Sequence, residues 1–138
     1  MTINEIQDEI ISDFELFDSW DDKYSYIIEL GKTMPKLAET HKIEQNIVRG
    51  CQSLVWLHAH TQENKLVFEG DSDAIIVKGL VSLLIKVLSG HQAQEIVNSP
   101  LYFLEKIGLS QHLSMTRANG LASMVILMQK YAKETSTK

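Results

Sequence analysis

The segment from Asp73 to Ser89 constrains the fold more than any other stretch of this chain, because most of it is Ile, Val and Leu. Its polar residues recur at spacings of four, four and three, which places them on one narrow stripe of a helix: Lys78, Ser82, Lys86 and Ser89. Other elements must therefore cover most of the helix, while Asp73 at its start favours the helix dipole. The length of the segment and its two lysines argue against a membrane span.

Two helices are expected near the N-terminus and one at the C-terminal end. Thr2 and the glutamate three residues later have the spacing of a capping box, which opens the first helix. Ser19 is expected to cap the second helix, and Pro35 ends it because the residue before a proline avoids helical geometry. The last helix is expected to begin at Thr116, and residues 134–138 are expected to form a frayed tail.

Between these helical regions the sequence predicts a small sheet. Residues 52–61 are rich in β-branched and aromatic side chains and are expected to form one strand. Residues 62–64 turn the chain into a second strand at 65–70, and residues 46–48 are expected to add a third, shorter strand. This order predicts an α+β fold, in which helices pack on one face of a three-stranded antiparallel sheet. The whole chain is expected to form a single domain.

The charge balance and the cysteine count limit the expected partners and compartment. Thirteen basic against eighteen acidic residues give a net charge of −5, so nothing favours nucleic acid or an anionic membrane as a partner. The N-terminal residues lack the basic start and apolar run of a signal peptide. With one unpaired cysteine, the chain is expected to be cytoplasmic, where a thiol stays reduced and reactive.

The single cysteine, Cys51, follows a glycine and precedes the 52–61 strand. Gly50 lets the chain turn through conformations closed to other residues, so the thiol can be presented at a loop tip. A lone thiol forms no internal disulfide, but it can act as a nucleophile or as a carrier. The alternative is a buried structural cysteine, because free cysteines are among the most buried residues.

Four blocks of residues follow one another along nearly the whole chain: Trp20-Asp21-Asp22-Lys23-Tyr24, Gly50-Cys51-Gln52-Ser53-x-Val55-Trp56, Gly70-Asp71-Ser72-Asp73-Ala74 and Gln111-His112-Leu113-Ser114-x-x-Arg117-x-x-Gly120-Leu121. This pattern resembles that of the SufE-type sulfur-acceptor proteins, the partners of cysteine desulfurases in iron–sulfur cluster assembly. The resemblance implies a fold similar to that of the IscU-type scaffold proteins. A cluster scaffold itself is not expected, because its chemistry needs several cysteines.

The resemblance implies that Cys51 accepts sulfane sulfur, as a persulfide, from a SufS-type cysteine desulfurase and passes it to a scaffold for iron–sulfur clusters. The unloaded thiol is expected to lie against apolar side chains, with its loop everting at the desulfurase. Supporting or partner-binding roles are implied for Gly50, Gln52, Ser53, Asp73 and Arg117. No metal or cofactor is expected on this chain, since pyridoxal phosphate belongs to the desulfurase. The chain would stimulate its partner as an accessory protein more than an enzyme, as a monomer or a homodimer.

Other interpretations stay open at this level. The chain could be a CsdE-like relative serving a different desulfurase and other sulfur acceptors, or a non-catalytic adaptor in which Cys51 is structural. His58 and His60 alternate onto one strand face and could join Cys51 or His112 in a metal site. A dyad of Cys51 with a histidine would instead indicate a cysteine hydrolase or peroxidase. Arg49 either favours the thiolate electrostatically or is a solvated loop charge.

Overall fold

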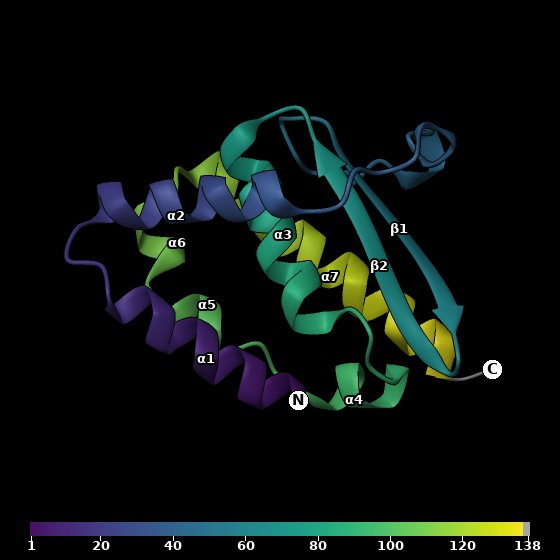
Figure 1. Cartoon of the computed structure of the whole chain (residues 1–138). Coiled ribbons are helices and arrows are strands. Elements are labelled where there is room, and N and C mark those ends of the chain that lie inside the picture. Colours follow the sequence, from purple (N-terminus) through teal and green to yellow (C-terminus); the bar gives the residue numbers. More distant parts are fainter. Residues whose placement is uncertain (137–138) are drawn as a thin grey trace.

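The computed structural model describes residues 1–136 and confirms the predicted α+β class (Figure 1). Its α-helices, 3₁₀ helices and strands are, in chain order, α1 (Ile3–Glu15), α2 (Trp20–Thr33), η1 (Glu39–His41), η2 (Glu44–Asn46), β1 (Val55–Gln62), β2 (Lys65–Ser72), α3 (Ile75–Leu88), α4 (Ala93–Asn98), α5 (Phe103–Lys106), α6 (Leu109–His112) and α7 (Met115–Ser136). Within residues 1–136, no helix combines the length and the apolar character that crossing a bilayer requires.

The long helices begin at the residues that local signals indicate, with one exception. Thr2 and Glu5 form both hydrogen bonds of the predicted capping box, and the Glu5 N–H donates to Thr2 Oγ1 at 3.1 Å. Ser19 accepts a backbone N–H of α2 at 3.2 Å, so it caps this helix as predicted. At α7 the predicted cap, Thr116, is wrong. Ser114 fills that place instead, because its Oγ accepts the backbone N–H three residues further on at 3.3 Å.

β1 and β2 form a two-stranded antiparallel sheet in which Gln62 is opposite Lys65. The two turn residues between them, Glu63 and Asn64, have φ angles of 53° and 66°. This left-handed geometry suits the twist of a tight hairpin, and asparagine adopts it readily. The predicted hairpin is therefore confirmed, with each strand ending one or two residues later than expected.

The predicted third strand at residues 46–48 is wrong. Within the described chain, Ile47 alone pairs with the sheet there, through one antiparallel bridge to Trp56. The 3₁₀ helix η2 ends immediately before this bridge, and Gly50 turns the chain away shortly after it with a φ of +95°. Too few extended residues remain between these two turns for a ladder of hydrogen bonds. The expected similarity to IscU-type scaffolds stays a prediction.

Helix α3 forms the centre of the core, between α2, β2 and α7 (Figure 1). Leu80, Leu83 and Leu84 are each only 1% exposed, as expected for a helix with a single narrow polar stripe. Part of that stripe is used internally, because the Ser82 hydroxyl donates to the Leu30 carbonyl of α2 at 3.1 Å. The other long helices and the sheet therefore pack against α3 and bury its apolar side chains.

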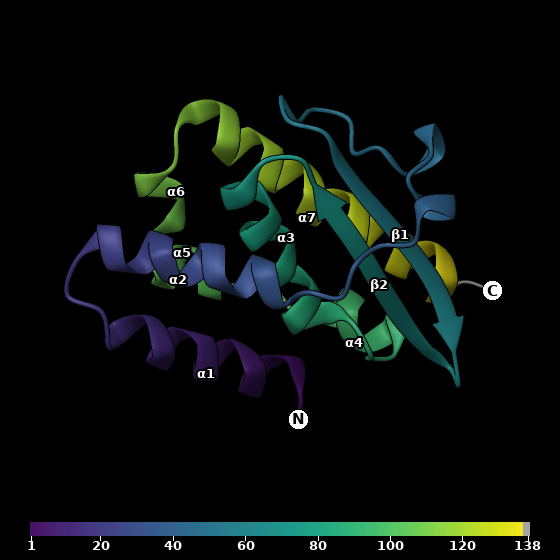
Figure 2. The same ribbon diagram turned by 45° about the horizontal axis from the view of Figure 1, so that its top comes forward.

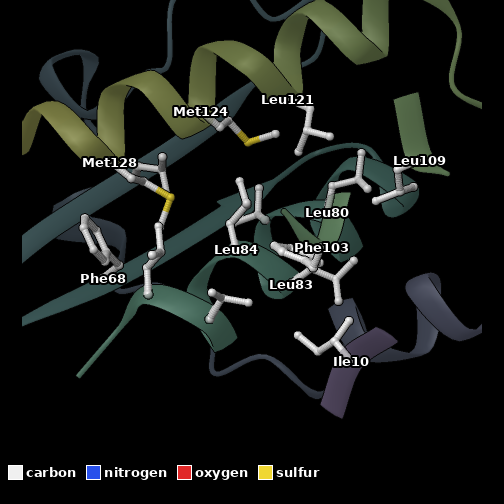
Figure 3. Packing of buried hydrophobic residues seen from close by; sticks show 14 of the residues in the cluster. Ile10, Phe68, Leu80, Leu83, Leu84, Phe103, Leu109, Leu121, Met124 and Met128 are labelled. Atoms are coloured by element: carbon white, nitrogen blue, oxygen red, sulfur yellow. The ribbon is translucent and has the colours of Figure 1, made fainter. Parts of the chain in front are cut away.

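Helix α7 packs against α3 and against the same face of the sheet. Met124 and Met128 point from α7 toward the side chains of α3 in Figure 3, and both are buried. The ring of Tyr131 lies 6.5 Å from the ring of Phe68 on β2, between centroids. Val81 of α3 reaches the same face of β2. The α-helices therefore pack on one face of the sheet, as predicted.

The opposite face of the sheet is partly covered by the segment 34–46, which carries η1 and η2 (Figure 2). Lys42 in this segment pairs with Asp71 of β2 at 3.2 Å and lies 5.6 Å from the centre of the Trp56 ring. Lys78 of α3 reaches the other Asp71 oxygen at 3.4 Å. Burial would raise the pKa of Asp71, but a backbone N–H and the two lysines outweigh burial and lower that pKa. Through these two ion pairs, Asp71 of the sheet connects to both the segment 34–46 and α3.

Two features of the C-terminal half differ from the sequence analysis. The segment 93–112 contains three short helices that local signals do not locate. Helix α7 also continues to Ser136, so the prediction of a frayed tail is wrong for residues 134–136. The Thr135 hydroxyl donates to the Tyr131 carbonyl at 2.8 Å, one turn earlier in the same helix, and this bond stabilises the last turn. Residues 137–138 lie outside the described residues.

Helices α2 and α3 meet at two glycines. A Cβ atom on Gly79 would lie 2.2 Å from the Ile27 carbonyl oxygen, and one on Gly31 would lie 2.8 Å from the Gly79 nitrogen. Neither distance leaves room for a side chain, so the two backbones are in direct contact. Glycine is required here for close approach rather than for an unusual backbone angle.

We expect Gly79→Ala to lower the free energy of unfolding by about 3 kcal/mol or more, because the added methyl meets rigid backbone rather than a movable side chain. Urea unfolding followed by circular dichroism measures this change. The matched control is Lys86→Ala, on the exposed side of the same helix, which should change the free energy by less than about 0.5 kcal/mol. Equal stability of Gly79→Ala and the wild type would contradict the close contact.

Candidate functional site

Residues 49–53 form a loop whose two ends are fixed to the sheet region. On the N-terminal side, the Val48 N–H donates to a carbonyl of β1 at 2.9 Å. On the C-terminal side, the Leu54 N–H donates to Asp73 Oδ1 at 3.1 Å, and the Leu54 carbonyl accepts the Ser72 hydroxyl at 2.8 Å. Asp73, expected at a helix start and among the supporting residues, therefore holds one end of this loop.

Gly50 turns the loop and seats it on α7. Its φ of +95° belongs to the left-handed region that favours glycine. A Cβ atom at this position would also lie 2.5 Å from the Ser123 hydroxyl of α7. Any other residue would be strained and would collide with the helix, which agrees with the turn that the sequence predicts at Gly50.

The Cys51 thiol lies against a glycine of α7. The side chain is half-buried, and its Sγ donates a weak hydrogen bond to the Gly120 carbonyl at 3.6 Å. A Cβ atom on Gly120 would lie only 3.2 Å from Sγ, so the missing side chain makes the space that the sulfur occupies. Gly120 belongs to the last of the four family-like blocks, but the sequence alone assigns it no role at the thiol. The available signal was a glycine in the middle of a regular helix, which often has a packing or functional reason.

The thiol opens into a cavity of about 320 Å³. Its apolar wall comes from α3 and α7 and consists of Val77, Leu80, Leu121 and Met124. Its polar rim consists of Gln52, Ser53, Ser114, Thr116 and Arg117. The structure therefore brings together Cys51 and three of its expected supporting residues, while Gly50 and Asp73 shape the loop. Ser114 and Thr116 are additional rim residues that the sequence analysis did not assign to the site.

The surroundings of the Cys51 thiol disfavour its ionisation. Burial raises the pKa of Cys51, because a low-polarity environment disfavours the thiolate. Arg49 does not offset this effect, since its guanidinium points to the Glu44 carboxylate at 3.6 Å and both side chains are largely exposed. Arg49 is thus the solvated loop charge of the two alternatives. The resting thiol is a weak nucleophile until its surroundings change.

No histidine is among the residues that line this cavity. His112 instead stacks on Trp20, with ring centroids 3.9 Å apart, and its Nδ1 lies 2.9 Å from the Gly108 carbonyl oxygen. His112 therefore packs against α2 rather than lying at the thiol. Within the described residues, the structure supports neither a dyad of Cys51 with a histidine nor a metal site built on the thiol.

We expect Gly120→Ala to raise the rate at which iodoacetamide alkylates Cys51 severalfold, because the new methyl displaces the sulfur from its seat. The rate is measured by intact-protein mass spectrometry, and Cys51 is the single thiol that can react. Asn119→Ala, at the exposed neighbouring position of α7, is the matched control and should react at the wild-type rate. An unchanged rate in Gly120→Ala would show that this glycine does not shelter the thiol.

The raised pKa of Cys51 predicts a shifted pH profile for alkylation. Only the thiolate reacts, so the rate climbs as pH passes through the thiol pKa. We expect the midpoint in the folded protein to lie above the midpoint measured for the same chain in concentrated urea, where the thiol is solvated. Rates of iodoacetamide alkylation between about pH 6 and 10 test this, given an ordinary cysteine pKa of about 8.5. A folded midpoint at or below the unfolded one would argue against a sheltering cavity.

Comparison with known structures shows what fold the chain shares. The solution structure of a hypothetical protein from Thermus thermophilus is similar with a TM-score of 0.80 and 19% sequence identity. The match covers 96% of this chain and 97% of that chain. At this identity the likeness shows a common fold and nothing more.

Comparison with known sequences is more specific. An uncharacterised SufE-like protein of Rhizobium meliloti (strain 1021) is 47% identical over 123 residues, covering 86% of this chain and 88% of the relative. An uncharacterised SufE-like protein of Rhizobium etli is 48% identical over 131 residues, covering 91% and 88%. The family model for the SufE "Fe-S metabolism associated domain" matches residues 8–132. Across nearly its whole length, and including the Cys51 loop and the cavity behind it, the chain therefore belongs to the SufE family.

Proposed function

We propose that this protein is a sulfur carrier, in which Cys51 accepts sulfane sulfur from a cysteine desulfurase and releases it for iron–sulfur cluster assembly. Membership of the SufE family places the chain in iron–sulfur metabolism and implies association with a cysteine desulfurase. The observation that carries the finer proposal is the placement of the thiol. Cys51 lies at a glycine turn, half-buried, beside a cavity with room for one more sulfur atom.

The proposed step is a thiol–persulfide exchange. The Cys51 thiolate attacks the terminal sulfur of a persulfide on the desulfurase cysteine, and a new S–S bond forms. The S–S bond within the donor breaks at the same time, and the donor cysteine leaves as a thiolate. The terminal sulfur, with its proton, is now a persulfide on Cys51. No external oxidant or reductant is needed, because one S–S bond replaces another.

The cavity gives this carrier a resting state and a reason for gating. Apolar walls would protect a persulfide from solvent reductants, and burial disfavours ionisation of the empty thiol. Moving the loop outward at the desulfurase would expose the thiol and bring its pKa back toward the ordinary value. Reactivity would then be high only where a sulfur donor is present. The weak contact of Cys51 with the Gly120 carbonyl offers little resistance to such a movement.

The surroundings of the loop suit a protein partner. Leu54, Ile75 and Met115 are 44%, 67% and 80% exposed, and they belong to the three segments that border the cavity. Arg117 adds a permanent positive charge at the rim, suited to a carboxylate on the partner. We propose that this rim docks on a SufS-type desulfurase.

The remaining parts of the proposal concern the setting of the carrier. Pyridoxal phosphate is proposed to belong to the desulfurase, which releases the sulfur, rather than to this chain. The acceptor of the sulfur is proposed to be a scaffold for iron–sulfur clusters. A cytoplasmic location would keep the thiol reduced. Its action as a monomer or a homodimer stays a prediction.

Incubation with a SufS-type desulfurase and free cysteine, without reductant, tests the proposal. We expect intact-protein mass spectrometry to show at least one added sulfur on Cys51, removable by dithiothreitol, and we expect desulfurase turnover to rise. Cys51→Ser should lose both effects while still binding the desulfurase. The double variant Cys51→Ser with Ser110→Cys restores a thiol at an exposed position. It should also fail to stimulate, if the loop and cavity matter.

Two results would decide against the proposal in different ways. Full stimulation by Cys51→Ser would identify a non-catalytic adaptor in which the thiol is structural. No sulfur on the wild-type protein, with a desulfurase shown to be active, would remove Cys51 as the acceptor for that enzyme. Repeating the assay with a cysteine desulfurase of a different type then tests the CsdE-like alternative, because such a relative would be loaded by that enzyme.

A further inference from the structure

Two histidines and a glutamate come together on the face of the sheet that is turned away from α3 and α7. His58 on β1 lies directly opposite Glu69 on β2 in the strand register. His41, from η1, stacks on His58 with ring centroids 3.8 Å apart and ring planes 14° from parallel. One possible ligand atom from each of the three residues lies within 4.8 Å of the other two. Three separate elements thus contribute to a single cluster.

The cluster is accessible, and its two imidazole rings are not held by hydrogen bonds to other groups of the described chain. All three residues are half-buried. Within residues 1–136, the structure shows no hydrogen bond from a ring nitrogen of His41 or His58 to another protein group. His60 stands next to the cluster, with its Nδ1 3.5 Å from Glu69 Oε1. The other histidines differ, since the ring nitrogens of His91 contact the carbonyl oxygens of two other residues.

We propose that His41, His58 and Glu69 form a binding site for a divalent first-row transition metal ion such as Zn²⁺. Two imidazoles and one carboxylate are a common ligand set for zinc that leaves a fourth position open. Imidazole also selects these metals over Mg²⁺ and Ca²⁺, which prefer oxygen ligands. His60 is placed either to supply the fourth ligand or to orient Glu69.

The ligand atoms of the three residues lie within 4.8 Å of one another, close to the spacing that a bound metal ion requires. With metal–ligand distances of about 2.0–2.2 Å, tetrahedral ligand atoms lie roughly 3.3 Å apart. His58 and Glu69 are cross-strand neighbours whose backbones need not move. His41 is already held over the sheet because the adjacent Lys42 pairs with Asp71. We expect rotations of the three half-buried side chains to bring the ligand atoms to this spacing.

This cluster is separate from the Cys51 thiol, but a metal ion bound there would restrain the segment that leads to the Cys51 loop. From the sequence, His58 and His60 could join Cys51 or His112 in a metal site, although no metal was expected on the chain. The structure instead supplies His41 and Glu69 as partners. A bound ion would tie η1 to the sheet, and η1 lies on the segment that leads directly into the Cys51 loop.

Calorimetric titration with Zn²⁺ tests the proposal on the full chain carrying Cys51→Ser, which removes the thiol as a competing ligand. We expect one equivalent to bind with a Kd in the micromolar range and to raise the Tm, because the ion binds the folded state. His58→Phe keeps a ring for stacking but has no nitrogen ligand, and it should weaken binding at least tenfold. Glu69→Gln should do the same. The matched control, His91→Gln, should bind as tightly as its parent.

Two outcomes would overturn the proposal. One is equal affinity of the parent and both His58→Phe and Glu69→Gln, which would mean that zinc binds elsewhere. The other is no binding by the folded parent at about 1 mM Zn²⁺, which would leave the stacked histidines as a packing contact only. Circular dichroism confirms that each variant is folded. If His58→Phe does not fold, Glu69→Gln decides, because the Glu69 side chain is 41% exposed and its loss should not disturb the core.

Discussion

The burial of helix α3 is the constraint on which the rest of the structure depends. Apart from one narrow polar stripe its surface is apolar and has to be covered, and its contact with α2 is so close that backbone meets backbone at Gly31 and Gly79. The sheet and α7 complete the enclosure (Figure 1). Because Val77 and Leu80 of the same helix also line the Cys51 cavity, the element that organises the core also forms a wall of the functional site.

The two faces of the sheet present different chemistry. On the helical side, a thiol is stored in a partly apolar cavity, where burial raises its pKa and limits its reactivity. On the other side, imidazole and carboxylate groups gather under the segment 34–46. The loop of residues 49–53 connects the two regions, since it follows η1 and η2 and ends at β1. Only residues 42–50 therefore separate His41 on the outer face from Cys51 in the chain.

Elements with strong local signals were predictable from the sequence. The capping box at Thr2, the hairpin turn at Glu63 and Asn64, and the long apolar helix each depend on residues close together in the chain. The failures occur where local preferences are weak. The third strand reduces to a single bridge at Ile47, because the turns on either side leave too few extended residues. The short helices of 93–112 are stabilised by tertiary packing, which local patterns do not reveal: they bury Ile96, Phe103 and Leu109.

The sequence by itself determined that Cys51 is the one thiol, that Gly50 turns the chain before it, and that the blocks around them are those of the SufE family. Only the tertiary structure decided what stands beside the thiol. Gly120, whose carbonyl accepts the hydrogen bond from the Cys51 thiol, lies 69 positions further along the chain. Likewise, packing of η1 on the sheet, rather than any spacing motif, joins His41 to His58 and Glu69. Local sequence specifies turns and helical faces through nearby hydrogen bonds and periodicity, whereas such distant pairs are set by how the covered helix α3 arranges the elements around it.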